Sequence, residues 1–388
     1  MARSKTGERQ TSRGKPGITG HPGALGSFRR LIQLCRIDHI EREFIPRLSV
    51  LALMNFVSSP LRLLEQLRFA RQLRLTNIHP SPVFILGHWR SGTTHLQNLL
   101  SQDSSFGYLD GFQAIAPGFC LIGRGGIKHL LRRIVEPRNR TRPMDRVPFS
   151  LDAPQEEELA LANTTVHSFS HAFVFPKQAE WFFQRYVLLE GLSDLMKVKW
   201  REDYLQLLRK VSLAAEGKRL LLKNVTNTTR LPELLKLFPE AKFVCIHRNP
   251  FDVYASTVHL HERLLSICQL QRLSDLQIKK NVLSFYERFM RKYLNDRMLI
   301  PNGNLAEIRY DDLVQTPLDV LHGIYDHLNL GGFNEAEPSI RGYIESIRNY
   351  RRNRHILDPA DSARVSERWQ FAFNEWDYRM RPQDQDPS

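Results

Sequence analysis

The residues with the clearest chemical meaning form a glycine-bounded loop, 87–94, that directly follows the short apolar run 83–86. Leucines recur at helical spacing after the loop, so we expect it to join a buried strand to the N-terminus of a helix. At such a point free backbone N–H groups and the helix dipole attract an anion. The sequence therefore predicts a phosphate-binding loop.

The loop has the spacing G-x-x-x-x-G-T-T, which matches the P-loop of nucleotide triphosphatases except that Thr93 stands where their lysine should be. Because that lysine reaches the β- and γ-phosphates, its absence argues against hydrolysis of ATP or GTP. Arg90 supplies a cation earlier in the loop, where it could meet the far end of a 5′-phosphate. Ser91, Gly92 and Thr94 complete the predicted cradle with backbone amides and hydroxyls. Taken alone, the loop could also be an ordinary strand-to-helix turn.

A second motif begins with Arg248, which follows the apolar run 241–247 that we predict to be another strand. An arginine at a strand end can hold a phosphate through two parallel hydrogen bonds. Asn249 and Pro250 suit the start of a helix, and Ser256 then lies about two turns along that helix. Taken alone, an arginine after a strand can equally form a surface ion pair.

Both motifs resemble those of the sulfotransferases that use 3′-phosphoadenosine 5′-phosphosulfate (PAPS). Residues 89–94 look like the family's 5′-phosphosulfate loop, and residues 243–256 are similar to its 3′-phosphate motif. The resemblance is strongest to the branch containing tyrosylprotein and many bacterial sulfotransferases, and it covers roughly residues 83–313. It implies that Arg248 and Ser256 bind the 3′-phosphate, and that the enzyme moves a sulfuryl group from PAPS to a hydroxyl or amine without a metal ion.

The resemblance also indicates lesser cofactor contacts. Lys223 ends the predicted strand 219–223, and Tyr310 opens a Tyr-Asp-Asp-Leu sequence similar to a motif of the family. Three arginines near the C-terminus could close over the nucleotide, as basic residues do in relatives, or could be exposed charge: Arg351, Arg352 and Arg354. By analogy with phosphoryl transfer, we expect the protein to position the donor in line and to neutralise charge on the leaving oxygen.

A general base is expected near the acceptor, because the acceptor must lose a proton during transfer. In relatives this base is a glutamate or a histidine. We favour Glu156, Glu157 and Glu158, since neighbouring carboxylates can raise the pKa of one member. Segments 142–145 and 154–158 also match a recurring pattern of the bacterial branch. Three alternatives stay open, the last two on one predicted helix face: Asp110, His167 and His171.

Predicted strands and helices alternate along the chain, and these elements must position the candidate residues. Apolar runs at 83–86, 219–223, 241–247 and 305–309 are predicted to be buried strands, with helical patterns between them. This alternation predicts an α/β fold with a P-loop-type parallel β-sheet flanked by helices, and ligands at the carboxyl ends of the strands. We also predict a helix that Asp152 caps in a capping box with Gln155, and helices with an aromatic core across 177–216.

The chain is predicted to form one sulfotransferase domain, 26–388, after a disordered basic tail, 1–25. Within the domain we expect a helical preface at 26–80, the catalytic core at 83–313 and C-terminal helices at 314–388. A basic stretch rich in Gly and Pro, 103–148, would be an insertion on the substrate side. The apolar stretch 48–64 is short for a membrane span and is interrupted at 58–60, so we favour packed helices there over peripheral membrane contact.

Composition limits the possible classes of function but does not identify one. The formal net charge of +14 favours anionic partners, among them nucleotides, nucleic acid and anionic membranes. The four cysteines are far apart and show no metal-ligand spacing, so we expect reduced thiols, no metal and a cytoplasmic enzyme. With PAPS and an acceptor as the expected partners, we predict no nucleic-acid partner. A P-loop kinase and a non-catalytic anion-binding protein are the rival functions. The acceptor could be a carbohydrate, a lipid, a phenol or a peptide.

Overall fold

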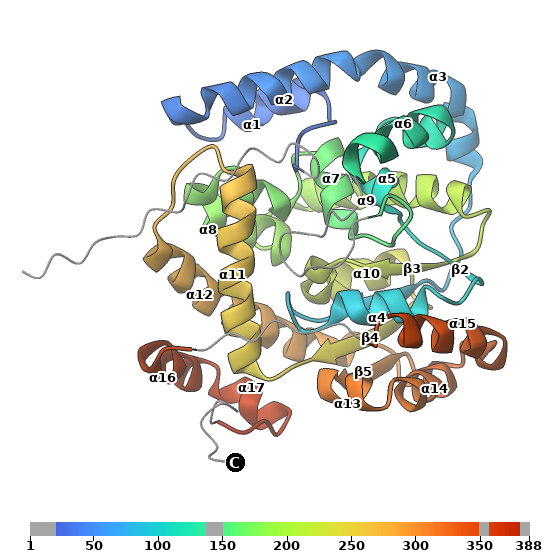
Figure 1. Cartoon of the computed structure of the whole chain (residues 1–388), viewed down its shortest axis with the longest axis vertical. Coiled ribbons are helices and arrows are strands. Elements are labelled where there is room, and N and C mark those ends of the chain that lie inside the picture. Colours follow the sequence, from blue (N-terminus) through green and yellow to red (C-terminus); the bar gives the residue numbers. More distant parts are fainter. Residues whose placement is uncertain (1–20, 137–149, 349–356, 381–388) are drawn as a thin grey trace, which may run out of the picture.

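A five-stranded parallel sheet forms the centre of the computed structural model, which describes residues 21–136, 150–348 and 357–380 (Figure 1). The strands lie in the order β2-β3-β1-β4-β5, so that β1 is in the middle. Their bounds are β1 Val83–Leu86, β2 Phe106–Gly107, β3 Arg219–Lys223, β4 Lys242–His247 and β5 Leu305–Arg309. The predicted α/β fold with a P-loop-type sheet is confirmed, and all four predicted strands are present. The edge strand β2 has two residues, too few to show a pattern in the sequence.

Helices account for most of the remaining described residues (Figure 1). Before the sheet lie α1 Phe28–Cys35, the 3-10 turn η1 Arg42–Phe44, α2 Ile45–Val57 and α3 Ser59–Leu75. Between β1 and β5 lie α4 Thr93–Leu100, α5 Gly111–Ile115, η2 Ile122–Arg124, α6 Gly126–Val135, α7 Glu157–Thr164, η3 Phe169–Phe173, η4 Pro176–Gln178, α8 Ala179–Phe182, η5 Phe183–Val187, α9 Asp194–Ala214, η6 Val225–Thr229, α10 Leu231–Leu237, α11 Pro250–Cys268, α12 Asp275–Asp296 and η7 Arg297–Leu299. After β5 lie α13 Tyr310–Gln315, α14 Pro317–Leu328, α15 Phe333–Ser346, α16 Pro359–Arg368 and α17 Gln370–Glu375.

The sheet is buried on both faces because its side chains alternate between two hydrophobic cores. Phe84 and Phe243 point into the larger core, which includes residues of α7 to α12. Ile85 and Val244 point into the other core, which includes residues of α4, α14 and α15. The near-continuous apolar runs that predicted buried strands therefore reflect helices on both sides of the sheet (Figure 1).

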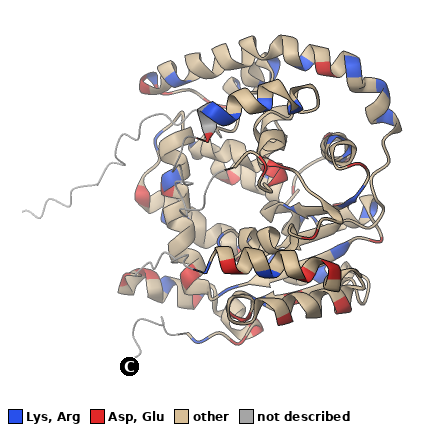
Figure 2. Cartoon of the chain, turned by 45° about the vertical axis from the view of Figure 1, so that its right-hand side comes forward, with Lys and Arg blue, Asp and Glu red and all other residues tan. Residues whose placement is uncertain are grey.

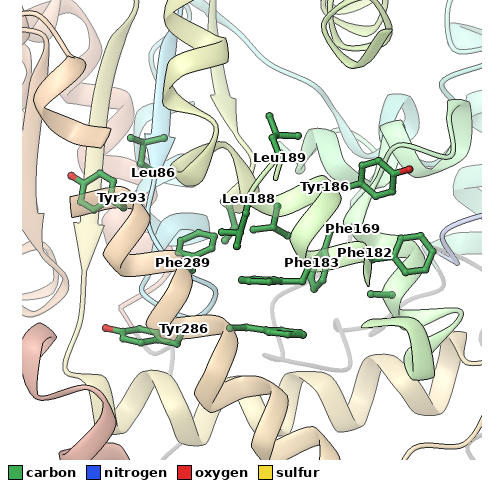
Figure 3. Close-up of a cluster of buried hydrophobic side chains, with 14 of the residues drawn as sticks. Leu86, Phe169, Phe182, Phe183, Tyr186, Leu188, Leu189, Tyr286, Phe289 and Tyr293 are labelled. Atoms are coloured by element: carbon green, nitrogen blue, oxygen red, sulfur yellow. The ribbon is translucent and has the colours of Figure 1, made fainter. Parts of the chain in front are cut away.

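An aromatic cluster fills part of the larger core (Figure 3). Phe183 stacks on Phe285 with the ring centroids 4.1 Å apart, and Tyr286 stacks on Trp369 at 3.7 Å. Phe183 and Tyr186 are buried where α8 runs into η5. The aromatic residues in the predicted 177–216 helices therefore serve the core, as expected.

The N-terminal helices lie across one end of the molecule (Figure 1). The helical preface expected at 26–80 is present as α1 to α3. Residues 21–25, which the sequence places in the tail, are packed into the domain instead. His21 is buried with Nε2 2.9 Å from the Cys268 carbonyl oxygen, and the Gly23 N–H donates to Asn163 Oδ1. The predicted boundary at residue 25 is thus too late, and residues 1–20 lie outside the described chain.

The segment before α7 differs from the prediction. We expected a helix from Asp152 with Gln155 completing a capping box, but α7 begins only at Glu157 and has no side-chain cap. Residues 151–155 instead run beside 109–112, where Pro154 forms an antiparallel bridge with Asp110 and the Gln155 N–H donates to a backbone carbonyl. These tertiary hydrogen bonds hold the chain extended where local signals favoured a helix.

Two predicted segments are described in part. The substrate-side insertion at 103–148 forms α5, η2 and α6 as far as residue 136, and 137–149 lie outside the described residues. The C-terminal region 314–388 forms α14 to α17, with 349–356 and 381–388 outside them. The C-terminal region is helical where the structure describes it, whereas the insertion also contributes the edge strand β2.

Candidate active site

Four predicted cofactor-binding segments follow the carboxyl ends of strands. β1 leads into the loop, β3 ends at Lys223, β4 leads to Arg248 and β5 leads to Tyr310. Because the strands are parallel and adjacent, these ends meet at one edge of the sheet. There they line a cavity of about 1070 Å³, which residues of α4, α7, α11 and α15 complete.

The glycine loop needs both of its glycines. Gly87 has φ +141°, and a Cβ there would lie 2.4 Å from a backbone carbonyl oxygen of β4. Gly92 has φ +109° and caps α4, and a Cβ there would lie 2.3 Å from the ring of Tyr310. Strand, loop and helix follow one another as predicted, and Thr93 and Thr94 in the first turn of α4 line the cavity. The backbone therefore passes too close to its neighbours for any residue but glycine.

Replacing Gly92 with alanine is expected to weaken binding of 3′,5′-bisphosphoadenosine (PAP), the desulfated form of the expected cofactor, at least about tenfold. The new methyl group must displace the Tyr310 ring or distort the loop. Isothermal titration calorimetry measures the change. Gly303→Ala is the matched control, because Gly303 also has a positive φ of +79° but a Cβ there meets nothing within 4 Å. Equal losses in the two variants would contradict the role of the Gly92–Tyr310 contact.

Arg90 and Ser256 join the two predicted anion motifs. Arg90 Nε donates to Ser256 Oγ at 2.8 Å, across 166 residues of sequence. Arg90 has φ +69°, a left-handed conformation that costs a non-glycine residue about 1 kcal/mol and therefore needs tertiary support. Ser256 lies in α11 as predicted, but it stands behind Arg90 and does not line the cavity. Ser91 is likewise buried and does not line it.

Arg248 lies beside the same loop. Its guanidinium carbon is 4.6 Å from the centroid of the Tyr310 ring, which is the ring that packs against Gly92. Its Nη2 is also 2.9 Å from the carboxylate of Asp252, whose side chain is 45% exposed. Exposed ion pairs contribute little free energy, so an anion in the cavity can compete for this guanidinium. The two predicted anion motifs are thus neighbours across one aromatic ring.

Lys223 is more central than the lesser contact that we predicted. Its Nζ donates to Glu156 Oε1 at 2.5 Å and to Thr94 Oγ1 at 3.4 Å, and its side chain is only 3% exposed. A cation therefore stands beside the first turn of α4 although Thr93 occupies the usual lysine position. The sequence does not reveal this arrangement because Lys223 and Thr94 are 129 residues apart.

The three glutamates that we favoured as the general base lie in different surroundings. Glu156 lines the cavity beside Lys223, with its side chain 31% exposed. Glu157 is fully buried, where it accepts hydrogen bonds from the Lys223 N–H at 3.0 Å and from the Tyr204 hydroxyl at 3.1 Å. Glu158 reaches the cavity wall but is buried in an ion pair with Arg230 at 3.0 Å. Of the three, Glu156 alone combines access to the cavity with a place beside the lysine.

Burial raises the pKa of Glu157 to about 7, although its hydrogen bonds favour the carboxylate. The folded protein therefore keeps a proton that the unfolded chain has lost, and Glu157 destabilises the fold as the pH rises from about 4.5 to about 7. We expect Glu157→Gln, which resembles the neutral acid, to remove up to about 3 kcal/mol of this pH dependence. Urea unfolding at about pH 5 and about pH 8 measures the free energies.

Glu202→Gln, at a carboxylate with 59% of its side chain exposed on α9, is the control for this pH dependence and should leave it unchanged. A free-energy difference between wild type and Glu157→Gln that is the same at both pH values would contradict the raised pKa of Glu157.

The alternative bases have structural roles. Asp110 caps α5 and pairs with Lys128 at 2.7 Å. His167 pairs with Asp203 at 2.9 Å, and burial lowers the pKa of His171 to about 3. None of these three candidates lines the cavity. The prediction that the two histidines share a helix face is wrong, because the 3-10 helix η3 begins only after His167.

A second group of lining residues is apolar and was missed in the sequence. Leu260, Leu264 and Cys268 follow Ser256 along α11 in steps of four residues, so they lie on one face of that helix. From Leu260 to Cys268 this face spans about 12 Å. Further apolar lining comes from Trp89, Phe169, Phe173 and, from the N-terminal segment, Pro22. Apolar spacing of this kind predicts only a packed helix, so the sequence could not identify it as a cavity wall.

Two further predictions concern three C-terminal arginines and the absence of a metal ion. Arg351, Arg352 and Arg354 lie outside the described residues. Within the described ranges, no group of three or more His, Cys, Asp and Glu side chains is arranged to hold a metal ion. A metal-free reaction stays a prediction.

Comparison with known proteins decides the family. The model of the sulfotransferase family matches residues 82–335, which contain β1, the loop, Lys223, Arg248 and Tyr310. The chain belongs to the sulfotransferase family. The predicted enzyme class is therefore confirmed, and the rival functions, a P-loop kinase and a non-catalytic binding protein, lose their support.

Relatives of this sulfotransferase extend over most of the chain. The omega-hydroxy-beta-dihydromenaquinone-9 sulfotransferases Stf3 of Mycobacterium tuberculosis and Mycobacterium bovis are each 31% identical to it over 337 residues, which is 85% of this chain and 85% of theirs. The crystal structure of sulfotransferase STF9 from Mycobacterium avium is 18% identical with a TM-score of 0.66, covering 90% of both chains. That of STF1 from Mycobacterium tuberculosis H37Rv is 18% identical with a TM-score of 0.60, covering 88% of this chain and 91% of its own. Both structures share the fold of this sulfotransferase.

Proposed function

We propose that this sulfotransferase moves a sulfuryl group from PAPS to a hydroxyl group of an acceptor that carries a long apolar chain. The supporting observation is a single cavity that has a cationic loop at one end and an apolar wall of about 12 Å along α11. An apolar chain would cover that wall, whereas a sugar or peptide would leave much of it in contact with water. The Stf3 relatives are named for a hydroxylated dihydromenaquinone, which supports an acceptor of the same class.

The residues at the cationic end suit the two anionic ends of PAPS. The free N–H groups at the start of α4 and the guanidinium of Arg90 would hold the 5′-phosphosulfate. Arg248 and Tyr310 would hold the 3′-phosphate. Ser256 would act through Arg90, whose Nε it already holds in place.

When bound, PAPS supplies a sulfuryl group linked through a bridging oxygen to a phosphate that can leave. Arg90 belongs to the loop and Lys223 reaches it from the end of β3, and their charges would stabilise the negative charge that develops on this oxygen. Glu156 would take the proton of the acceptor hydroxyl as its oxygen bonds to sulfur. Lys223 orients that carboxylate through their 2.5 Å hydrogen bond.

Equilibrium binding tests the donor. We expect PAP to bind at least about tenfold more tightly than ATP, because ATP has no 3′-phosphate for Arg248. A protein that binds the two nucleotides equally would contradict PAPS as the donor.

Transfer of radiolabelled sulfate from PAPS tests the acceptor. Among primary alcohols of increasing chain length, kcat/KM should rise as the chain covers more of the α11 wall. A preference for sugars or tyrosine peptides would contradict the acceptor class and leave the donor unaffected.

We also propose a reducing, cytoplasmic setting, which the four free cysteines support. Alkylation of protein taken from its natural source without reductant tests this setting. Modification of all four thiols after unfolding is the expected result, and a disulfide would contradict it.

A further inference from the structure

The helices α2 and α3 expose apolar side chains on their outward side in addition to those that pack against the domain. Exposed apolar residues recur at helical spacing through both helices and across the break at Ser58. Phe56 is 71% exposed and Leu67 is 73% exposed. We call this surface the α2–α3 outer face and define it by Val50, Leu53, Phe56, Val57, Leu64 and Leu67.

The inner side of the same helices combines apolar packing, with Leu51 buried, and buried polar groups that bond to other parts of the protein. Asn55 Nδ2 donates to the Gly23 carbonyl at 2.7 Å, and Glu65 accepts from the Leu121 N–H and from Lys210 Nζ, both at 2.6 Å. Packed helices were predicted at 48–64, and they are packed, with Leu51 buried. Six apolar residues of this stretch are exposed, however, which the sequence did not indicate: Val50, Leu53, Phe56, Val57, Leu63 and Leu64.

The buried polar groups decide how these helices can meet a membrane. Among the described residues, Arg42–Leu75 is the one helical run long and apolar enough to cross a bilayer, and 17% of its most apolar stretch is buried. Crossing would bring Asn55, Arg62 and Glu65 into hydrocarbon and break the hydrogen bonds of Asn55 and Glu65 to the rest of the protein, which is costly. A helix that lies along the surface keeps those bonds, with its apolar side in the lipid interface.

The charges beside the outer face indicate which surface it fits. α2 and α3 contain five arginines and one acidic residue, Glu65, which is buried against Lys210. Arg68, Arg71 and Arg74 are exposed along the second half of α3. Figure 2 shows α2 and α3, at the top of the view, as largely uncharged, with basic residues where α3 descends. Clustered arginines next to an apolar face attract the headgroups of anionic lipids.

We propose that the α2–α3 outer face, together with Arg68, Arg71 and Arg74, docks this enzyme on an anionic lipid bilayer. The inference goes beyond the proposed function, because it needs neither the donor nor the acceptor. Docking on a bilayer would also explain which end of the cavity lies nearest to α2. Pro22 lines the cavity at the N-terminal segment, and Arg47 of α2 donates to the Gln269 carbonyl at 2.7 Å, next to Cys268 at the apolar end. Docking therefore brings the apolar end of the cavity close to the lipid.

Sedimentation of the full chain with vesicles tests the proposal, without PAPS present. The vesicles are phosphatidylcholine alone and phosphatidylcholine mixed with phosphatidylglycerol. We expect binding to the mixed vesicles, and at least about tenfold weaker binding by the double variant Phe56→Glu, Leu67→Glu. Arg71→Gln with Arg74→Gln should weaken binding to the mixed vesicles several-fold, to roughly that seen with phosphatidylcholine alone.

A second double variant, Leu195→Glu with Met298→Glu, is the matched control, since these residues are 76% and 85% exposed outside the α2–α3 outer face. It should bind vesicles as the wild type does, and circular dichroism and PAP binding check that both double variants are folded. Wild-type protein that binds neither vesicle would overturn the proposal, as would an outer-face variant that binds normally. So would a wild-type dimer that the outer-face variant dissociates, because a second copy would then cover this face.

Discussion

Glu156→Gln is expected to lower kcat by about 10²- to 10⁴-fold while PAP affinity changes little. The amide has the size of the carboxylate and can still accept the hydrogen bond from Lys223 Nζ, but it cannot take a proton from the acceptor. The loss should therefore appear in the chemical step and leave nucleotide binding intact. Steady-state kinetics with PAPS and a fixed alcohol acceptor, together with calorimetry of PAP binding, separate these two quantities.

Asp152→Asn is the matched control for Glu156→Gln. Asp152 also lines the cavity, but its side chain is 59% exposed and pairs with Lys128 at 2.7 Å instead of facing the first turn of α4. Its replacement should change kcat by less than about threefold, because exposed ion pairs contribute little. Normal activity in Glu156→Gln, or an equal loss in both variants, would show that Glu156 is not the base.

Glu158→Ala is expected to reduce the free energy of unfolding by about 3–5 kcal/mol. The Arg230 side chain is completely buried, and its guanidinium donates to Glu158 Oε2 at 3.0 Å. The same carboxylate accepts hydrogen bonds from Asn224 at 2.8 Å and from the Phe169 N–H at 2.7 Å. Removing it leaves a buried cation and several buried donors unpaired, which is the costly way to break an ion pair.

Urea unfolding measures the effect of Glu158→Ala, and Glu202→Ala at an exposed pair with Lys199 serves as the control, with an expected loss below about 1 kcal/mol. Similar losses in the two variants would contradict the buried network.

The pH dependence gives a second check on Glu158. Burial by itself would raise the pKa of Glu158, but the charge of Arg230 and the hydrogen bonds outweigh burial and hold the pKa below its usual value. A carboxyl group with a lowered folded-state pKa stabilises the fold above its unfolded pKa of about 4.5, and that stability is lost as the pH falls through the folded-state value. The difference between wild type and Glu158→Ala should therefore shrink at acidic pH. The dependence is opposite in direction to that of Glu157, the adjacent residue.

The glycine loop and the fold could be predicted because their signals are local. The apolar run, the loop and the first turn of α4 occupy one continuous stretch, and the steric demands at Gly87 and Gly92 appear in the sequence as the glycines themselves. Arg248 was found for the same reason, since it directly follows a buried strand. Parallel strands then bring such segments to one edge without any further information.

The roles of the carboxylates could not be predicted in this way. Glu156, Glu157 and Glu158 are consecutive and chemically alike, yet one lines the cavity, one is buried with a raised pKa and one neutralises a buried arginine. The lysine and the arginine that they contact lie 66 to 72 residues further along the chain, at the end of β3 and beyond it. The pKa of a carboxyl group depends on the water and charge around it, and these are set by residues that packing brings together.

The sequence by itself determined the parallel sheet, the glycine loop between β1 and α4 and the enzyme family, because each rests on short runs whose local geometry follows from residue type. Tertiary structure decided which carboxylate lies beside Lys223 in the cavity, that Lys223 stands beside α4, and that many apolar residues of α2 and α3 point outward. These outcomes depend on which surface of an element meets another element far away in the chain. Hydrophobic periodicity shows that a helix has two sides but not which side the rest of the protein will cover.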